Sequence, residues 1–307
     1  MDNKILESIQ NKKNELDSYR PLSSAIAKKL AEQIKIEWTY NTNAIEGNTL
    51  TLQETEIVIK NGITIGGKSL NEHLEAINHK QGIEYIEQII TEKKEINEEI
   101  IKELHYMILK GIDDTEAGKY RNQNVRIVGA NIIPPQSIKV PSKMEELLNW
   151  YNENQTKISI PQLAAQMHYK LVCIHPFIDG NGRVSRLLMN LILMKNGYPP
   201  AIILNVDRKK YYKVLNEANL GKLEPFEDFI GRSIDRSLVL YLNSVKPNLQ
   251  ENEGFILLKD ATQYCDYSQE YLSLLARKGK LSAIKLNNEW VTTKGNIEEY
   301  IKKKGKR

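Results

Sequence analysis

Apolar residues recur at helical spacing through most of the first 245 residues. Ile26, Leu30 and Ile34 lie four residues apart, and this spacing predicts a helix that buries one face. The same pattern, or signals that bound a helix, predicts further helices elsewhere. The predicted helices cover 22–47, a segment starting at 51, 71–91, 97–110, 142–154, 161–174, 207–219 and 225–243.

Local signals mark where several of these helices begin and end. Thr51-Leu-Gln-Glu forms a capping box, and Asn97 stands where an N-cap is expected. Gly47 predicts the end of the first helix, because glycine readily adopts the left-handed conformation of a helix C-cap. Asn196-Gly197, ahead of Pro199-Pro200, ends the helix that precedes it.

Two segments depart from the helical pattern. Residues 125–138 predict a β-hairpin that turns near Gly129. Beyond the polar residues 246–253, the pattern shortens to helix, turn, helix, a hairpin around Asn287-Asn288 and a last helix. That order predicts a small winged helix over 254–307. The expected fold class is mainly α, with one hairpin and a small C-terminal α+β domain.

Composition places the chain among ordinary globular proteins. Hydrophobic residues make up 41% of it and charged residues 27%. No apolar run approaches the ~20 residues of a membrane span, and the first residues lack the apolar core of a secretory signal. The two cysteines, Cys173 and Cys265, cannot build a disulfide framework. A cytoplasmic location is therefore expected, and the abundance of Asn, Lys and Ile suggests a bacterial genome.

The run His175 to Arg186 concentrates groups that suit a nucleotide polyphosphate under attack by a hydroxyl. His175 can accept a proton near neutral pH, and Asp179 can bind Mg²⁺ together with phosphate oxygens. Gly180-Asn181-Gly182 exposes backbone amides at the start of a predicted helix, where anions bind. Arg183 and Arg186 are three residues apart, so both guanidiniums share one helical face.

His-Pro-Phe-Ile-Asp-Gly-Asn-Gly-Arg-Val-Ser-Arg matches the motif of the Fic (Fic/Doc, or Fido) family at every position. The resemblance implies a Fic-type helical bundle and the transfer of AMP from ATP to a Tyr, Thr or Ser hydroxyl of a protein, including the chain itself. His175 would act as the base, Asp179 would hold Mg²⁺, and Gly180, Asn181, Gly182, Arg183 and Arg186 would bind phosphates. Gly182 favours AMP transfer, because relatives with lysine there phosphorylate instead.

The same resemblance assigns roles to two further segments. The predicted hairpin corresponds to the family's flap, where Val128 and Gly129 would contact the nucleotide. The flap residues Ala130, Asn131, Ile132 and Ile133 would pair with an extended target segment, although a purely structural hairpin is the alternative. Tyr211, Tyr212 and Asn219 are spaced like adenosine-contacting positions, although two tyrosines on a helix are also typical of plain packing.

Thr42-Asn-Ala-Ile-Glu46-Gly47-Asn48 resembles the family's inhibitory motif, [S/T]-x-x-x-E-[G/N]. Its place ahead of the core would make the chain a class II member. Glu46 would pair with Arg186 and so keep that guanidinium from the γ-phosphate, while Thr42 would fix the rotamer of Glu46. The expected organisation is an N-terminal helical region with the inhibitory helix (1–95), a Fic core (96–245), a linker (246–253) and the winged helix (254–307).

Several alternatives stay open. Glu46 could instead serve in removing AMP from a modified protein, either alongside transfer or as the main activity. Residues 254–307 hold eleven Lys or Arg against six Asp or Glu, so this segment could bind DNA in an ATP-sensing regulator, or dock another protein. The expected partners are ATP, a target protein and, as in class II relatives, a second copy of the chain. No membrane partner is expected.

Overall fold

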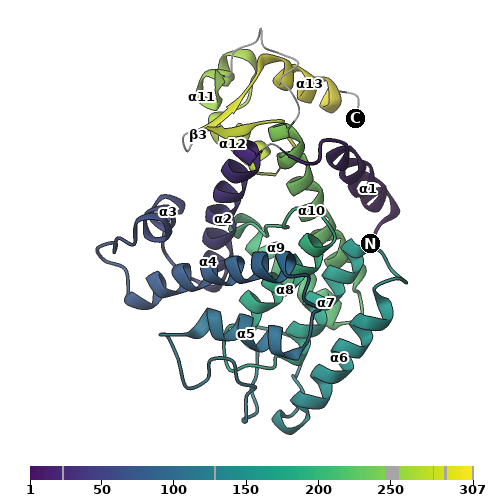
Figure 1. The fold of residues 1–307 in the computed structure, drawn as a ribbon. Coiled ribbons are helices and arrows are strands. Elements are labelled where there is room, and N and C mark those ends of the chain that lie inside the picture. Colours follow the sequence, from purple (N-terminus) through teal and green to yellow (C-terminus); the bar gives the residue numbers. More distant parts are fainter. Residues whose placement is uncertain (23, 128, 246–255, 279, 287–288, 306–307) are drawn as a thin grey trace. The chain divides into compact units, whose positions relative to one another are not determined.

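The computed structural model describes residues 1–22, 24–127, 129–245, 256–278, 280–286 and 289–305 (Figure 1). It is mainly helical, as predicted. The chain forms two compact units. The larger unit comprises residues 1–6 and 31–234, and the smaller unit comprises residues 7–30 and 235–307. None of the helices in these described ranges combines the length and the apolar composition that crossing a bilayer requires.

Helices make up most of residues 24–245, and every helix predicted there is formed. They are α2 (Ser24–Glu46), α3 (Leu52–Asn61), α4 (Leu70–Thr91), α5 (Glu98–Leu109), α6 (Val140–Asn154), α7 (Ile160–Ile174), α8 (Asn181–Lys195), α9 (Arg208–Asn219) and α10 (Glu224–Val245). Two short 3₁₀ turns, η1 (Ser137–Lys139) and η2 (Asn205–Asp207), precede α6 and α9. The central element is α8, which packs against α4, α5 and α7 and is buried along most of its length.

Capping side chains place the ends of several helices. The capping box at Thr51 is confirmed, with Thr51 Oγ1 accepting from the Glu54 amide and Glu54 accepting from the Thr51 amide. Asn97 caps α5, as predicted. Ser69 and Glu72 form a second capping box at the start of α4, which the sequence analysis did not identify. Helix α2 ends at Glu46, and Gly47 follows with φ of 110°.

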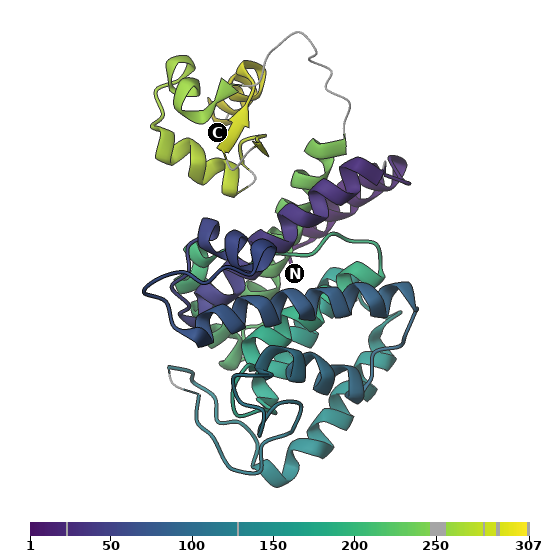
Figure 2. The ribbon, with the colours of Figure 1, turned by 60° about the vertical axis from the view of Figure 1, so that its left-hand side comes forward.

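The paired strands predicted for residues 125–138 are not formed among the described part of that segment. The residues instead form an extended loop, here called the flap, which reverses where the Ala130 amide donates to the Ile127 carbonyl oxygen (Figure 2). Pro134 and Pro135 lack the amide N–H that a strand ladder needs. At the base of the flap the Arg121 guanidinium supplies hydrogen-bond donors instead. It donates to the carbonyl oxygens of Gln123 and Pro135 and so joins the two arms of the flap.

The smaller unit includes a compact α+β region. Its elements are β1 (Ile256–Leu257), α11 (Leu258–Ala261), η3 (Thr262–Tyr264), α12 (Gln269–Arg277), β2 (Ile284–Leu286), β3 (Glu289–Thr292) and α13 (Lys294–Gly305). The predicted hairpin strands pair antiparallel, and β1 adds to the other edge of β3. Their turn at 287–288 and the linker 246–253 lie outside the described residues. Leu258, Leu272, Leu275 and Ile297 belong to the core of this region. Most of α1 (Asn3–Ser18) also belongs to the smaller unit.

Candidate active site

The motif loop joins α7 to α8 through two residues in the left-handed conformation. His175 ends α7 with φ of 49° and ψ of 58°, and its amide donates to the Leu171 carbonyl oxygen at 2.9 Å. Gly180 precedes α8 with φ of 74°, and among the described residues no side chain caps this helix. The first amides of α8 therefore keep their capacity to bind an anion.

Close contacts explain both glycines of the motif. A Cβ atom at Gly180 would lie 3.3 Å from Ile108 Cγ2 and 3.4 Å from His105 Cδ2. A Cβ atom at Gly182 would lie 2.5 Å from Glu46 Oε1, which is closer than any ordinary contact. The Glu46 carboxylate thus lies directly against the backbone that would receive phosphate oxygens.

His105 packs against the motif loop and bonds to its backbone, a role that was not predicted from the sequence. Its ring stacks on Phe177 with centroids 3.7 Å apart. The Gly118 amide donates to His105 Nδ1 at 2.9 Å, so Nε2 carries the hydrogen and donates to the Asp179 carbonyl oxygen at 3.1 Å. Burial lowers the pKa of His105 to about 4, which keeps the ring neutral in this arrangement.

The Asn181 side chain bonds within the loop itself, and the phosphate-binding role expected of it stays a prediction. Its Oδ1 accepts from the Phe177 amide at 3.0 Å, and its Nδ2 donates to the Phe177 carbonyl oxygen at 2.9 Å. Both polar ends are thereby used, and the residue is buried. Asn181 shapes the loop, and its backbone amide is the group that stays available for a phosphate.

Arg183 lies between two carboxylates. Its Nη2 donates to Asp179 Oδ2 at 3.0 Å, and its Nη1 donates to Glu75 Oε1 at 3.2 Å. Asn48 in turn donates to Glu75 Oε2 at 2.7 Å. Arg183 is buried, whereas the side chain of Asp179 is 70% exposed. Glu75 was not singled out from the sequence, because nothing in its own helix distinguishes it from a solvated glutamate.

The structure brings Glu46 and Arg186 together. Arg186 Nη2 donates to Glu46 Oε1 at 2.6 Å. Burial lowers the pKa of Arg186, but the Glu46 carboxylate and Tyr211 together outweigh burial and raise that pKa above its usual value. Thr42, expected to help fix the rotamer of Glu46, contacts the same guanidinium. Its Oγ1 accepts from Arg186 Nε at 2.7 Å and its carbonyl oxygen from Nη2 at 3.1 Å, so α2 holds this guanidinium through two residues.

The three positions predicted to contact adenosine differ in exposure. Tyr211 is buried and its hydroxyl lies 3.0 Å from His168 Nε2, as the packing alternative would have it, and its contact with adenosine stays a prediction. Tyr212 is half-buried with Arg208 over its ring at 5.0 Å. Asn219 is also half-buried, and its Nδ2 donates to Asn216 Oδ1 at 3.4 Å. Val128 lies outside the described residues.

The electrostatic setting of His175 suits a general base. Burial is the largest cause that lowers its pKa, with a smaller contribution from the positive charge of Arg121. Arg121 also donates from Nε to the His175 carbonyl oxygen at 2.8 Å, and its amide donates to the Pro176 carbonyl oxygen at 2.9 Å. The imidazole is therefore neutral at physiological pH, and Arg121 joins its backbone to the base of the flap.

The flap presents apolar surface beside this loop. The side chain of Ile133 is 84% exposed, while Ile132 and Ala130 are half-buried and Asn131 is exposed. An extended, exposed backbone with a protruding isoleucine can receive another extended chain.

Asp179 is the residue of the motif that suits Mg²⁺. It is an exposed carboxylate next to the amides at the start of α8. Within the described ranges, no group of three or more His, Cys, Asp or Glu residues could hold a metal alone. A single carboxylate fits an ion that takes its remaining ligands from phosphates and water, as Mg²⁺ usually does.

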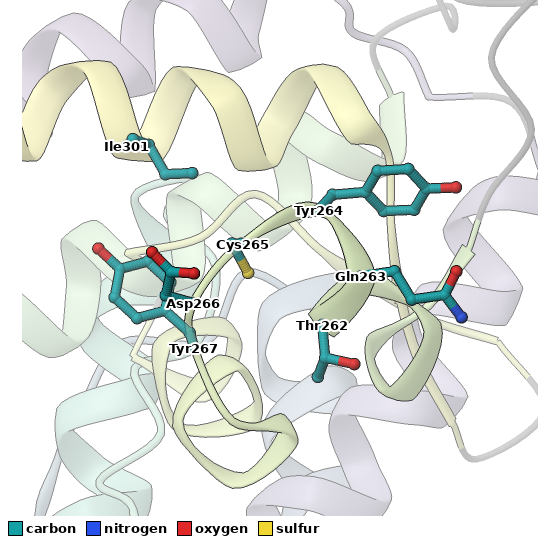
Figure 3. Close-up of a pocket in the computed structure, with 7 residues that line it drawn as sticks. All are labelled: Thr262, Gln263, Tyr264, Cys265, Asp266, Tyr267 and Ile301. Atoms are coloured by element: carbon teal, nitrogen blue, oxygen red, sulfur yellow. The ribbon is translucent and has the colours of Figure 1, made fainter.

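A separate hollow lies in the smaller unit and contains no residue of the motif. Its volume is about 500 Å³, and its lining comprises Thr262, Gln263, Tyr264, Cys265, Asp266, Tyr267 and Ile301 (Figure 3). Three hydroxyl groups and one carboxylate make this lining polar, with no cation among its seven residues. A lining of this kind does not favour phosphate, so the hollow gives no support to nucleotide binding there.

Comparison with known proteins agrees with the motif. A family model described as Fic/DOC family matches residues 95–193. The protein adenylyltransferase Fic of Drosophila ananassae is 39% identical over 243 residues, which are 79% of this chain and 48% of the relative. The chain spans about half the length of the curated relatives that it matches.

Solved structures share the fold. The Fic domain containing signaling protein of Bacteroides thetaiotaomicron superposes with a TM-score of 0.73 at 30% identity, over 78% of this chain and 98% of that chain. Residues 134–508 of Fic-1 from C. elegans superpose with a TM-score of 0.73 at 34% identity, over 79% of this chain and 72% of that chain.

Proposed function

Because the chain belongs to the Fic/DOC family, we propose that it is a protein adenylyltransferase, which transfers AMP from ATP to a Tyr, Thr or Ser hydroxyl of a protein, including itself. The observation that carries the proposal is the juxtaposition of a neutral imidazole with an uncapped helix N-terminus and two buried arginines. His175 supplies the imidazole, and Arg183 and Arg186 follow at the start of α8. These are the groups that phosphoryl chemistry needs.

The reaction follows from these positions. The imidazole of His175 accepts the proton of the target hydroxyl as the hydroxyl oxygen bonds to the α-phosphorus of ATP. The bond from that phosphorus to the oxygen bridging to the β-phosphate breaks, and pyrophosphate leaves. The amides at the start of α8 and the Arg183 guanidinium offset the negative charge that grows on the leaving group. Nδ1 of His175 is buried, which leaves Nε2 for the substrate.

Asp179 is the residue proposed to hold Mg²⁺. The ion, when bound with ATP, neutralises part of the triphosphate charge. Arg183 contacts the same carboxylate, so it restricts the orientations that the Asp179 side chain can take. The flap then aligns the target segment, so that its hydroxyl meets His175.

Glu46 is proposed to inhibit this reaction. Its carboxylate occupies the Arg186 guanidinium, which would otherwise bind the γ-phosphate. Three carboxylates, from Glu46, Glu75 and Asp179, face the two guanidiniums of the motif. Both guanidiniums are thus already paired with carboxylates before ATP arrives, and the triphosphate must displace Glu46 to reach Arg186.

The position of the label in ATP tests the proposed reaction. The full chain is incubated with Mg²⁺ and ATP labelled at either the α- or the γ-phosphorus, and protein-bound label is measured. We expect α-label on the protein and no γ-label, with the α-label lost in a His175→Ala variant. Protein-bound γ-label would mean phosphate transfer, and α-label independent of His175 would mean another mechanism.

Removal of AMP from a modified protein is a second candidate activity. The observation in its favour is that Glu46 Oε1 lies against the backbone at Gly182, where a carboxylate could orient a water toward a bound phosphodiester. Pre-modified protein that loses its AMP label in the presence of wild-type chain, but not with a Glu46→Gly variant, would support it. Label loss that is equal for the two variants would exclude this role for Glu46.

Further binding partners and the cellular location are also proposed from the sequence alone. DNA or protein binding by residues 254–307, a homodimer, and a cytoplasmic bacterial setting stay predictions. Both cysteines are free, which is compatible with a reducing compartment.

A further inference from the structure

The side chain of Asn216 holds the tip of the flap from the side of α9. Asn216 Nδ2 donates to the Gly129 carbonyl oxygen at 3.0 Å, and Asn216 Oδ1 accepts from the Asn131 amide at 3.3 Å. Both contacts are made to backbone groups of the flap, one at Gly129 inside its turn and one at Asn131 just after it. A carboxamide, with its donor and acceptor side by side, is the group that can serve both.

The flap needs such an external contact because it lacks a strand ladder of its own. Among its described residues, one backbone bond, from the Ala130 amide to the Ile127 carbonyl oxygen at 3.2 Å, closes the turn. Arg121 fixes the base of the flap through Gln123 and Pro135. The orientation of the flap around Gly129 then depends on its contacts with other elements, and Asn216 makes two hydrogen bonds to it.

The helix that carries Asn216 also carries the positions proposed to contact adenosine. Asn219, one of the positions proposed to contact adenosine, donates from Nδ2 to Asn216 Oδ1 at 3.4 Å. Asn216 Oδ1 thus accepts from Asn219 and from the flap at once. Tyr212, the second half-buried position of that set, lies one helical turn earlier on α9.

We propose that Asn216 is a positioning residue that orients the flap for the protein substrate. Its carboxamide holds the backbone around Gly129 and Asn131. The exposed edge near Ile133 can then pair with an extended target segment so that the target hydroxyl lies next to His175. The inference rests on the proposed adenylyl transfer and adds the residue that governs the use of the protein acceptor. Because Asn216 acts through the flap, its loss should affect the protein substrate far more than ATP.

The test uses the full chain with Glu46→Gly as the parent, so that transfer is not limited by inhibition. A second full-length copy that carries His175→Ala serves as acceptor, since it cannot modify itself. Asn216→Ala is compared with the parent and with Lys213→Ala, a control on the exposed side of the same helix. Transfer of α-label to the acceptor copy is measured against acceptor concentration. Binding of the α,β-methylene analogue of ATP is measured by calorimetry.

We expect Asn216→Ala to lower the kcat/KM for the acceptor copy by at least about fivefold, as the loss of two hydrogen bonds implies. The dissociation constant of the ATP analogue and the melting temperature should stay within about twofold and about two degrees of the parent, and Lys213→Ala should match the parent throughout. Unchanged transfer by Asn216→Ala would overturn the inference, as would an equal loss in binding of the analogue. Absence of any α-label with the parent would instead overturn the proposed function.

Discussion

At the scale of single residues, the site combines a neutral imidazole with two arginines that are already paired with carboxylates. His175 is held in a left-handed conformation that few side chains adopt, and its backbone is bound by Arg121. Nearby, Glu75 and Asp179 contact Arg183, while Glu46 contacts Arg186. The imidazole is ready to accept a proton, whereas the arginines are already occupied. The proposed inhibition would therefore act on the position of the phosphates and leave the base intact.

The lowered pKa of His175 predicts how the rate depends on pH. Burial makes the protonated imidazole less stable than in water, so the neutral, active form persists below pH 6.5. In the Glu46→Gly variant, AMP transfer should be constant from pH 8 to about 6.5 and fall only as the pH drops through the lowered pKa. A pH series of initial rates measures this. A midpoint above pH 6.5, or a rate that rises as the pH falls, would contradict the assignment of His175.

At the scale of elements, the C-terminal part of α2, which ends at Glu46, is bonded to the segment around the start of α9. Arg208 Nε at the start of α9 donates to the Ile45 carbonyl oxygen at 2.6 Å, and Asn41 Oδ1 accepts from the Asn205 amide at 2.8 Å. Both contacts join α2 to the segment that leads into α9. The position of Glu46 is thus set by these two bonds of α2 as well as by its own ion pair with Arg186.

Removing the Arg208 contact should weaken inhibition while leaving Glu46 in place. Arg208→Ala leaves the Ile45 carbonyl without this donor, and the last turn of α2 gains freedom to leave Arg186. We expect AMP transfer to rise by about two- to fivefold, the equivalent of one partly exposed hydrogen bond. The rise should disappear when Glu46→Gly is already present. Lys209→Ala, an exposed neighbour, is the control, and a rise in it of the same size would argue against the specific contact.

At the scale of the whole molecule, the larger unit buries three neutral histidines. Burial lowers the pKa of His105 to about 4 and that of His168 to about 3, and burial together with Arg186 and Arg183 brings that of His79 well below 6.5. Each ring accepts a proton in the unfolded chain at a higher pH than in the fold. The unfolded state therefore binds more protons below pH 6.5, and acid favours unfolding.

Stability should consequently fall as the pH drops from 6.5 toward 4. Three such groups give a slope approaching about 4 kcal/mol per pH unit in the free energy of unfolding, since each proton contributes about 1.4 kcal/mol per unit. Urea titrations followed by tryptophan fluorescence at pH 7, 6 and 5.5 measure it. His105→Gln should lower this slope by about 1.4 kcal/mol per pH unit, the contribution of one proton. A free energy of unfolding that does not change over this range would show that the histidines are not buried neutral.

Comparison of the predictions with the fold shows what local sequence can tell. Thr51 and Asn97 start their helices because a cap depends on residues three positions away. Glu75, His105 and Asn216 were missed because their roles depend on partners about 75 to 110 residues distant. The flap was predicted as paired strands because its apolar pattern outweighed its two prolines. Tyr211 faces the core because the packing of α9 against its neighbours, which a motif does not encode, decides its side.

The most direct test of the account is the rate of AMP transfer with and without the inhibitory carboxylate. Wild type, Glu46→Gly, Glu46→Gln and the double variant Glu46→Gly/His175→Ala are incubated with Mg²⁺ and α-labelled ATP, and label on the full chain is followed with time. The account predicts that Glu46→Gly raises the rate by at least about tenfold, as freeing a buried arginine implies. Glu46→Gln should fall between wild type and Glu46→Gly, and the double variant should carry no label. Equal rates for wild type and Glu46→Gly, or label on the double variant, would contradict it.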